Sequence, residues 1–356
     1  MLHFSQLLTL ATLSLMPQGT ADDVVAPARP TETVIRQGVV MGAPWQVTVQ
    51  GIDRPAALAS TEIVLKALTG SEQRLSNWKQ NSELSKWNRT TPGQPLPCGR
   101  TLAQEIARAE HWSRITSGAF SPLAEPLVQA WDLRGEGRVP SAIELNAALL
   151  ATRADGLTWQ DEQPIRAANV QVASGGFGKG AAMDCALRQL APLTPITLNV
   201  GGQVLVQGRT ESIQIAHPVH RQLSIANWEL SSGSLATSGN SERGITVDGT
   251  RFSHIIDART GQPARDFGSV TVWCENALDA DCLSTALFAL GPDEGLKLAA
   301  TLPGVRALFV ELHEGQPRLR ATRNCQEFLS SQQPIQWFLE PLANHPTPNK
   351  TGMAQQ

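Results

Sequence analysis

An aspartate and a threonine four residues apart, Asp281 and Thr285, lie in the apolar stretch ALDADCLSTALFALG. This stretch has helical spacing, so both side chains should project from one face of a helix. A carboxylate and a hydroxyl together suit a hard cation such as Mg²⁺, which completes its ligand shell with water and substrate phosphates. Two polar residues on an exposed helix face would give the same pattern, so the spacing alone leaves both interpretations open.

A histidine is the second candidate for chemistry. His254 lies in RFSHIIDARTGQPAR, at the expected end of a strand that precedes a turn at Gly261. Its imidazole could act as a general acid or base or contact a phosphate, and it could equally be a hydrogen-bonded structural residue. The other histidines show no metal-binding spacing, and no serine lies in a G-x-S-x-G turn.

The glycine-rich segment ASGGFGKGAAMDCA, residues 173–186, looks like a phosphate-binding loop. A Walker A loop requires Ser or Thr after its lysine, whereas Gly180 follows Lys179 here, so this motif is excluded. The stretch from Gly176 to Ala181 fits the short dinucleotide pattern, but no acidic residue follows in PITLNVGGQVLVQG to bind a ribose. A tight turn into a helix, with glycines needed only by the backbone, remains the alternative.

The composition excludes several classes of protein. The chain has 356 residues, of which 41% are hydrophobic, enough to bury a full core. A net charge of −3 and the lack of a Lys or Arg run argue against nucleic-acid binding. Tyrosine is absent, which excludes phenol chemistry. The five cysteines form no C-x-x-C zinc pair, and Cys185 and Cys282 lie in helix-like apolar stretches that predict burial.

The N-terminus resembles an export signal. The apolar run LLTLATLSLM is followed by small residues, which predicts a signal peptide over residues 1–21, cleaved near Ala21. A short buried helix is the alternative. This run is too short to span a bilayer, and no other stretch is long and apolar enough to do so. We expect a flexible leader over residues 22–32 and a disordered tail over residues 341–356.

The elements between these ends predict an α+β fold. Hairpins are expected around Gly42, at Gly201-Gly202 and at Asp248-Gly249. Helices are expected in STEIVLKALTGSEQRLSNW, in TLAQEIARAEHWSRITSGAF, after a capping box that begins at Ser141, and in ALDADCLSTALFALG up to Gly291. Because strands and helices do not alternate regularly, largely antiparallel sheets in one domain, about residues 33–340, are favoured.

Taken together, these segments resemble a known family. GGFGKGAAMDCA, LNVGGQVLVQG, ATSGN, SHIIDARTGQP and DADCLSTALFALGP occur in the order seen in the ApbE-like FAD:protein FMN transferases. MGAPWQVTV, LSNWKQNSELSKWN and SGAFSPLAEPLVQAWDL resemble earlier motifs of that family. The resemblance implies an ApbE-like single domain, with helices flanking largely antiparallel sheets, and a periplasmic location.

The resemblance also implies a reaction and a set of site residues. The glycine-rich segment should lie against the diphosphate of FAD, with Mg²⁺ held by the Gly176 carbonyl, Asp281 and Thr285. A Thr or Ser hydroxyl of an acceptor flavoprotein subunit or domain would attack the FMN-side phosphorus and AMP would leave, with His254 as the candidate that handles the hydroxyl proton. The nucleotide contacts carried over are Met41, Trp78, Ala119, Phe120, Ser121, Ala173 and Lys179.

Three positions depart from the family pattern. Ser121, Ala173 and Asn240 stand where the family usually has aspartate. Two of these acids normally touch FAD, and losing each should weaken binding by about 1–3 kcal/mol if it was a buried hydrogen-bond partner. The alternatives to a transferase are therefore a protein that binds or hydrolyses FAD without an acceptor, and a non-catalytic scaffold of the same fold.

Overall fold

The computed structural model describes residues 32–51, 53–94, 98–241 and 244–338. All of these residues fall in one compact unit. The predicted signal peptide, most of the predicted leader and the predicted tail lie outside the described residues.

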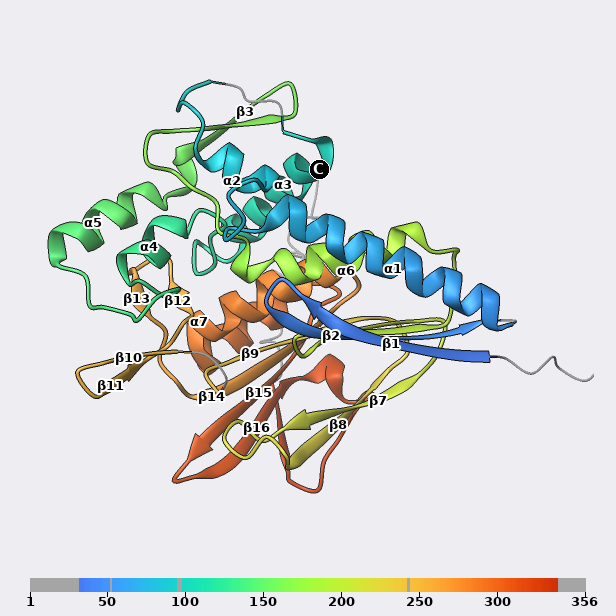
Figure 1. Cartoon of the computed structure of the whole chain (residues 1–356). Helices are drawn as coiled ribbons and strands as arrows, with labels where there is room; N and C mark the ends of the chain where they lie inside the picture. The colour runs from blue at the N-terminus through green and yellow to red at the C-terminus, as the bar shows by residue number, and fades with distance from the viewer. Residues whose placement is uncertain (1–31, 52, 95–97, 242–243, 339–356) are drawn as a thin grey trace, which may run out of the picture. The chain divides into compact units, whose positions relative to one another are not determined.

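The core of the fold is a nine-stranded sheet in the order β1-β2-β5-β6-β9-β14-β15-β16-β18 (Figure 1). All neighbouring strands run antiparallel except β16 and β18, which confirms the predicted α+β class with a largely antiparallel sheet. The strands are β1 (Glu32–Val40), β2 (Ala43–Gly51), β5 (Ile196–Val200), β6 (Gln203–Gln207), β9 (Gly233–Gly239), β14 (Gly268–Cys274), β15 (Arg306–His313), β16 (Gln316–Thr322) and β18 (Ile335–Phe338).

Three helices cover one face of this sheet: α1 (Arg54–Leu75), α6 (Gly178–Gln189) and α7 (Ala277–Thr301). α1 and α6 share a buried cluster with β2 and β5, and α7 shares another with β14 and β15. Alternation along each strand directs every second side chain to these helices. The helices are therefore held to the sheet by apolar burial.

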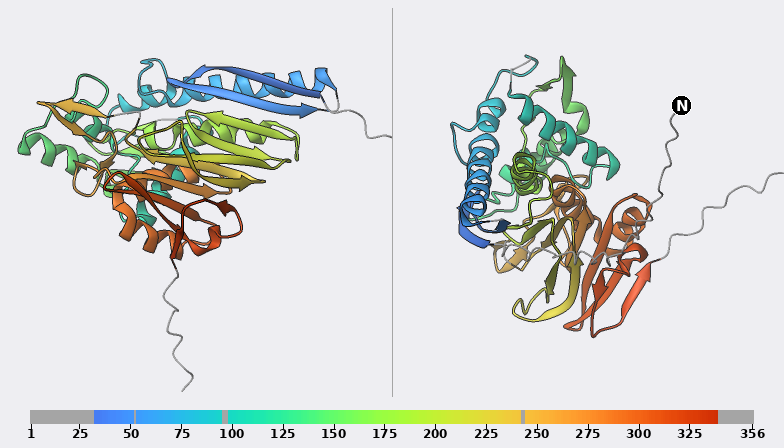
Figure 2. Two further views of the ribbon diagram at one scale, coloured as in Figure 1. Left: turned by 90° about the horizontal axis from the view of Figure 1, so that it is seen from below. Right: turned by 90° about the vertical axis from the view of Figure 1, so that its right-hand side faces the viewer.

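A three-stranded sheet covers the opposite face (Figure 2). Its order is β17 (Leu329–Ser330), β8 (Ser224–Leu230) and β7 (Glu211–Ala216). Trp228 and Ile215 of this sheet pack with Leu235 and Val310 of the large sheet. Three further hairpins pair β3 (Leu157–Gln160) with β4 (Gln163–Arg166), β10 (Ile245–Val247) with β11 (Thr250–Phe252), and β12 (Ile256–Asp257) with β13 (Gln262–Pro263).

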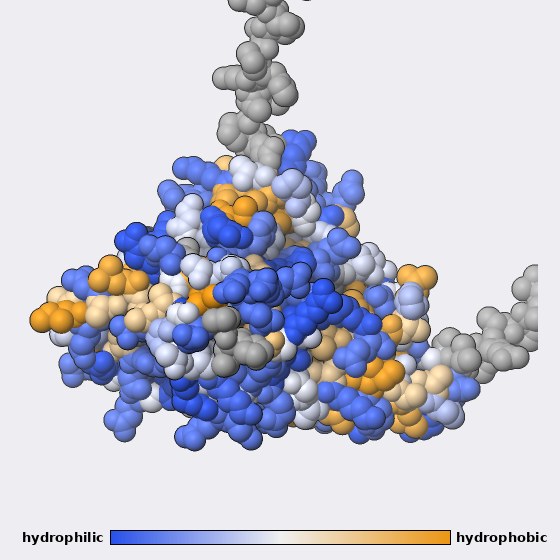
Figure 3. Space-filling view, turned by 90° about the horizontal axis from the view of Figure 1, so that it is seen from above, coloured by the Kyte–Doolittle hydropathy of each residue, from blue (hydrophilic) through white to orange (hydrophobic). Residues whose placement is uncertain are grey.

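Two of the remaining helices, α4 (Glu125–Ala130) and α5 (Ala142–Ala151), pack together in a small cluster. The single-turn helices are η1 (Ala154–Gly156), η2 (Ser174–Gly176) and η3 (Arg323–Cys325). The other two helices, α2 (Glu83–Asn88) and α3 (Arg100–Ile115), form a larger core with the start of α6 and α7. Trp87 and Ile106 pack with Phe177 and Cys282 in this core. Figure 3 shows a mostly hydrophilic surface with scattered apolar groups, one of them at the left end, where α5 lies in Figure 1.

Local signals in the sequence agree well with the structure. Gly201-Gly202 and Asp248-Gly249 have positive φ angles at both positions, as two-residue hairpin turns require. The capping box at Ser141 is formed with Glu144. α7 differs from the prediction: Gly291 leaves helical geometry with φ 78°, but the helix resumes at Pro292 and continues to Thr301. Proline fits this resumption because its fixed φ suits the first turn of a helix.

The predicted burial of cysteines is confirmed in part. Cys282 is fully buried on α7, whereas Cys185 on α6 is half-buried. None of the five cysteines is in a disulfide.

α6 and α7 cross unusually closely at Gly180. A Cβ atom at this position would lie 2.2 Å from the carbonyl oxygen of Ala277 and 2.6 Å from Cα of Leu278. Both neighbours are backbone atoms, so no side-chain rotation could relieve the contact. A serine or threonine, which a Walker A loop would place here, is therefore excluded by packing as well as by motif.

We predict that Gly180→Ala destabilises the protein by about 1–3 kcal/mol or more, because the added methyl group forces the two helix backbones apart. Gly70→Ala is the matched control, since Gly70 also lies within a helix and a Cβ atom there meets no atom within 4 Å. The control should gain about 0.5–1 kcal/mol. Urea unfolding of both variants measures the difference, and equal stability of Gly180→Ala and the parent would contradict the close crossing.

Candidate functional site

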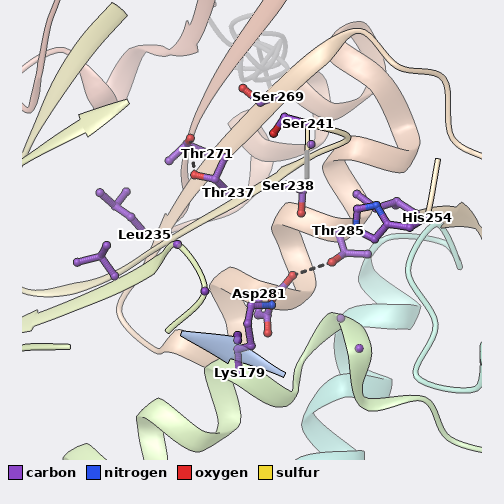
Figure 4. Close-up of a pocket in the computed structure, with 18 of the residues that line it drawn as sticks. Lys179, Leu235, Thr237, Ser238, Ser241, His254, Ser269, Thr271, Asp281 and Thr285 are labelled. Atoms are coloured by element: carbon purple, nitrogen blue, oxygen red, sulfur yellow. Dashed lines mark hydrogen bonds and ion pairs between the residues drawn. The ribbon is translucent and has the colours of Figure 1, made fainter. Parts of the chain in front are cut away.

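A cavity of about 810 Å³ brings together most of the residues that the sequence singled out (Figure 4). Its walls come from the glycine-rich segment, from α7, and from β7, β9 and β14. The predicted site residues that line it are Phe120, Ser121, Ala173, Gly176, Lys179, His254, Asp281 and Thr285. One cavity therefore contains the candidate metal ligands, the candidate base and the glycine-rich backbone.

Three predicted nucleotide contacts do not line this cavity. Met41 lies in the turn between β1 and β2, where its N–H donates to Glu72 Oε1 at 2.9 Å. Trp78 is 71% exposed, and the Arg134 guanidinium lies 5.7 Å from the centroid of its ring. Ala119 is fully buried.

Two aspartates hold the crossing of α6 and α7 from opposite sides. Asp184 on α6 accepts the N–H groups of Ala277 and Leu278, at 2.7 and 3.0 Å, in the first turn of α7. Asp281 on α7 accepts the N–H of Gly180, at 3.2 Å, in the first turn of α6. First-turn N–H groups have no partner within their own helix, and the positive end of a helix dipole favours a carboxylate. Each helix thus caps the other.

Asp184 was missed by the sequence analysis, although it is the acidic residue of α6 and lies between Met183 and Cys185. Burial raises its pKa, and this outweighs the opposite effect of the two N–H groups that it accepts. The available signal was an acidic residue in a stretch predicted to be buried, because such a carboxylate requires hydrogen-bond partners.

The other oxygen of Asp281 is in an ion pair. Lys179 Nζ lies 2.9 Å from Asp281 Oδ1, and both side chains reach the cavity wall (Figure 4). One turn further along α7, the Thr285 hydroxyl donates to the Asp281 carbonyl at 3.1 Å, a common local bond in helices. A Cβ atom at Gly176 would lie 3.3 Å from this hydroxyl oxygen, so the backbone of the glycine-rich segment passes directly beside it.

The donor set at this wall fits a small hard cation. It offers a carboxylate, a hydroxyl and the Gly176 backbone, and oxygen ligands of these kinds are the ones that Mg²⁺ prefers. Among the described residues, no group of three or more His, Cys, Asp and Glu side chains could hold a metal. A cation bound here would thus have one protein carboxylate and would compete with Lys179 for it.

Asp279, two residues before Asp281, has a different, structural environment. It accepts Arg108 Nε and Trp112 Nε1, each at 2.6 Å, and a second Arg108 nitrogen. This ion pair, in which the Arg108 side chain is 47% exposed, ties α3 to α7 and directs the Asp279 carboxylate away from the cavity lining.

Two asparagines fix the backbone that leads into the glycine-rich segment. Asn77 and Asn88 both donate to the Val172 carbonyl, at 2.8 and 2.9 Å. In return, Asn88 Oδ1 accepts the Val172 N–H at 2.8 Å, and Asn77 Oδ1 accepts the Ser174 N–H at 2.9 Å. The segment LSNWKQNSELSKWN therefore contributes two side chains that position the cavity wall, which the sequence analysis did not identify.

The three positions that depart from the family pattern have different surroundings. The Ser121 hydroxyl donates to the Thr152 carbonyl at 3.3 Å and accepts the Leu123 N–H at 3.1 Å. Asn240 is buried and its Oδ1 accepts the Ser253 hydroxyl at 2.7 Å. Ala173 lines the cavity with a methyl group. Two of the three thus serve local structure, while Ala173 leaves an apolar spot on the wall.

Charged side chains of both signs line the cavity. They are the cations Lys179 and Arg221 and the carboxylate of Asp281, which is paired with Lys179. His217 and His254 add two imidazoles. Burial and the nearby His220 lower the pKa of His217, which favours its neutral form.

No helix among the described residues is long and apolar enough to cross a membrane.

We predict that Asp184→Asn destabilises the protein by about 1–3 kcal/mol. An amide of the same size can accept only one of the two N–H groups of α7, and its own NH₂ would face the other. Asp161→Asn is the matched control, because Asp161 lies exposed in the β3–β4 turn and should change stability by no more than about 0.5 kcal/mol. Urea unfolding monitored by tryptophan fluorescence compares them, and a similarly small change in both variants would exclude the capping role.

Comparison with known proteins places the chain among flavin transferases. A sequence model described as the ApbE family matches residues 41–309. The FAD:protein FMN transferase of Klebsiella pneumoniae (strain 342) is 28% identical over 293 residues, which cover 77% of this chain and 83% of that protein. The protein of the same name from Escherichia coli (strain K12) is 26% identical over 281 residues, which cover 74% of this chain and 80% of the relative.

Solved structures agree with the fold described above. The ApbE protein of Thermotoga maritima has a TM-score of 0.75 at 27% identity and covers 83% of this chain and 99% of its own. The flavin transferase ApbE of Vibrio cholerae has a TM-score of 0.72 at 24% identity and covers 84% of this chain and 100% of its own.

Proposed function

This chain belongs to the ApbE family, and we propose that it transfers FMN from FAD to a Thr or Ser hydroxyl of an acceptor flavoprotein, with Mg²⁺ as cofactor and AMP as the second product. The observation that carries the proposal is the convergence of Asp281, Thr285, the Gly176 backbone and His254 on one cavity. A cavity of about 810 Å³ lies in the size range of sites for large cofactors.

The diphosphate of FAD would lie along the glycine-rich segment. Gly175 is exposed and a Cβ atom there meets nothing within 4 Å, so the backbone is accessible at this point of the wall. Lys179 supplies positive charge at the same wall. A diphosphate offers its ammonium a second anionic partner, which would free Asp281 for a cation.

Asp281, Thr285 and the Gly176 carbonyl are the groups that would hold Mg²⁺. When bound, the metal offsets the negative charge that develops on the phosphate oxygens during transfer. The protein supplies the fixed positions of these ligands through the reciprocal capping of α6 and α7.

The transfer replaces the phosphoanhydride bond between the two phosphates of FAD with a phosphoester bond to the acceptor. The acceptor hydroxyl oxygen forms a bond to the FMN-side phosphorus, and the bond from this phosphorus to the bridging oxygen breaks. AMP leaves with the bridging oxygen, and the hydroxyl proton goes to His254, which lines the cavity.

A second candidate is FAD hydrolysis without a protein acceptor, in which water replaces the hydroxyl. The alanine at position 173, where the family usually has aspartate, favours this candidate, because a changed nucleotide contact is consistent with a changed use of the site. The two candidates differ in their products: hydrolysis releases free FMN with AMP, whereas transfer leaves FMN attached to a protein.

We predict that Asp281→Asn lowers AMP release from FAD at least a hundredfold, because the amide cannot replace the charge that the cation requires. Chromatography of AMP measures the rate, and FMN fluorescence of the acceptor after denaturation distinguishes transfer from hydrolysis. Asp293→Asn is the matched control, since Asp293 lies beyond the kink of α7 with its side chain 79% exposed, and it should stay within about twofold. Undiminished turnover in Asp281→Asn would refute the site.

We also predict that Ala173→Asp tightens FAD binding in the presence of Mg²⁺ by about ten- to a hundredfold. A carboxylate there would restore a charge-assisted hydrogen-bond acceptor, worth about 1.5–3 kcal/mol, at a wall that now presents only a methyl group. Calorimetric titration compares it with Ala124→Asp, which adds the same charge at another position of the cavity lining and should not tighten binding. Equal affinities of Ala173→Asp and the parent would mean that other groups already fill this role.

A further inference from the structure

We propose that the acceptor polypeptide binds as an added β-strand along the free edge of β7, inside the cavity that contains Asp281 and Thr285. This inference rests on the proposed function, because it concerns how a protein substrate reaches the site of transfer.

β7 presents its edge to the cavity. It is the outermost strand of the sheet β17-β8-β7, and β8 is the only partner recorded for it among the described residues. Five consecutive residues, Ser212–Ala216, line the cavity. A strand that turned one face to the cavity would contribute only every second residue, because successive side chains point to opposite faces. Contributions from every residue indicate that the strand lies edge-on.

The hydrogen bonds of β8 show which backbone groups of β7 point into the cavity. The Glu229 N–H donates to Phe328 at 2.9 Å, on the β17 side, so the backbone groups of Glu229 point away from β7. Ser212 is paired with Glu229 and Gln214 with Asn227. In an antiparallel ladder these alternate positions are the ones that do not exchange hydrogen bonds. The N–H and C=O groups of Ser212 and Gln214 therefore point outward from β8.

These four groups match the requirements of an extended peptide. Two donors and two acceptors repeat at a spacing of two residues, which is the pattern that a strand added to a sheet edge satisfies. Natural proteins usually shield such an edge against unwanted pairing. Here the shielding comes from the cavity itself, whose opposite wall belongs to the large sheet.

The part of the cavity lining that the large sheet contributes opposite the edge of β7 is polar, although it lies between the large sheet and the three-stranded sheet. Thr237 of β9 and Thr271 of β14 lie there with their hydroxyl oxygens 2.9 Å apart, and Ser269 continues the row (Figure 4). Inner faces of stacked sheets are normally apolar. A row of hydroxyls suits the backbone and side chains of a polar peptide, and the same cavity continues from it to Asp281.

The nucleotide is the competing occupant of this part of the cavity. The contacts expected for FAD lie on other walls, at Phe120, Ala173 and Lys179. A regular two-residue repeat of main-chain groups is complementary to a polypeptide, whereas a nucleotide has no such repeat. The geometry therefore favours the acceptor on the β7 edge.

Gln214→Pro tests whether the free edge of β7 binds the acceptor, and it leaves the hydrogen bonds between β7 and β8 in place. Proline removes the outward N–H of Gln214, which β8 does not use, and proline is tolerated on edge strands in this orientation. The probe is a pool of capped octapeptides with a central threonine and random flanking residues, since main-chain recognition tolerates varied sequences. FMN-peptide formation by mass spectrometry, and the Kd for FAD with Mg²⁺, are measured on each variant.

We expect Gln214→Pro to form FMN-peptide at least tenfold more slowly than the parent, with the Kd for FAD unchanged within twofold. Gln214→Ala removes the same side chain but keeps the N–H, so we expect Gln214→Pro to form FMN-peptide at least threefold more slowly than Gln214→Ala. If Gln214→Pro does not fold, the parent protein is given the same pool with N-methylated amides on both sides of the threonine, and the same tenfold loss is expected.

Each other outcome overturns a defined claim. Equal FMN-peptide formation by Gln214→Pro and parent, or by methylated and plain peptides, refutes the strand on β7. A weakened Kd for FAD in Gln214→Pro assigns this edge to the nucleotide instead. A parent that releases AMP and free FMN but modifies no peptide in the pool is a hydrolase, which refutes the proposed transfer and with it the acceptor strand. A parent that does not bind FAD refutes the proposed function itself.

Discussion

The crossing of α6 and α7 is the constraint on which the candidate site depends. The two helix backbones approach so closely that position 180 has no room for a side chain. At this contact Asp184 and Asp281 each accept N–H groups from the opposite helix. Asp281, the carboxylate on α7 that caps α6, is thus also the candidate metal ligand. Its position follows from the same hydrogen bonds that hold the two helices together. A site built on two mutually capped helix ends is fixed more firmly than one built on loops.

The proposed contacts with the nucleotide and those with the acceptor polypeptide lie on opposite faces of the large sheet, around one cavity. On its helical face, the glycine-rich segment and α7 bring charge and oxygen ligands to the place where we propose that phosphate chemistry occurs. On its other face, β7 offers main-chain groups, and β9 and β14 offer the side-chain hydroxyls of Thr237 and Thr271. Transfer between a nucleotide and a protein needs both, because the two substrates have different chemistry and must meet at one phosphorus.

Local sequence patterns predicted much of this architecture. The four-residue spacing of Asp281 and Thr285 indicated one helix face, and glycine pairs indicated the hairpin turns, since both signals depend only on neighbouring residues. The contacts that complete the site join distant parts of the chain: Asp184 bonds residues 93 and 94 positions away, and Asn88 bonds Val172 across 84 positions. Hydrophobic periodicity contains no information about such pairs. The free edge of β7 was also unpredictable, because it depends on which strand lacks a neighbour in the folded sheet.

The burial of the unpaired cysteines determines how readily the protein reacts with oxidants and disulfides. Burial raises the pKa of Cys98 and of Cys325 to about 11, and it raises the pKa of Cys274 and Cys282 as well. The thiolate is the form that attacks disulfides and oxidants, so these four groups stay inert while the core remains closed. Cys185, half-buried on α6, is the thiol that an oxidant would reach first. The fold therefore needs no disulfide, and its covalent structure can be the same in a reducing or an oxidising compartment.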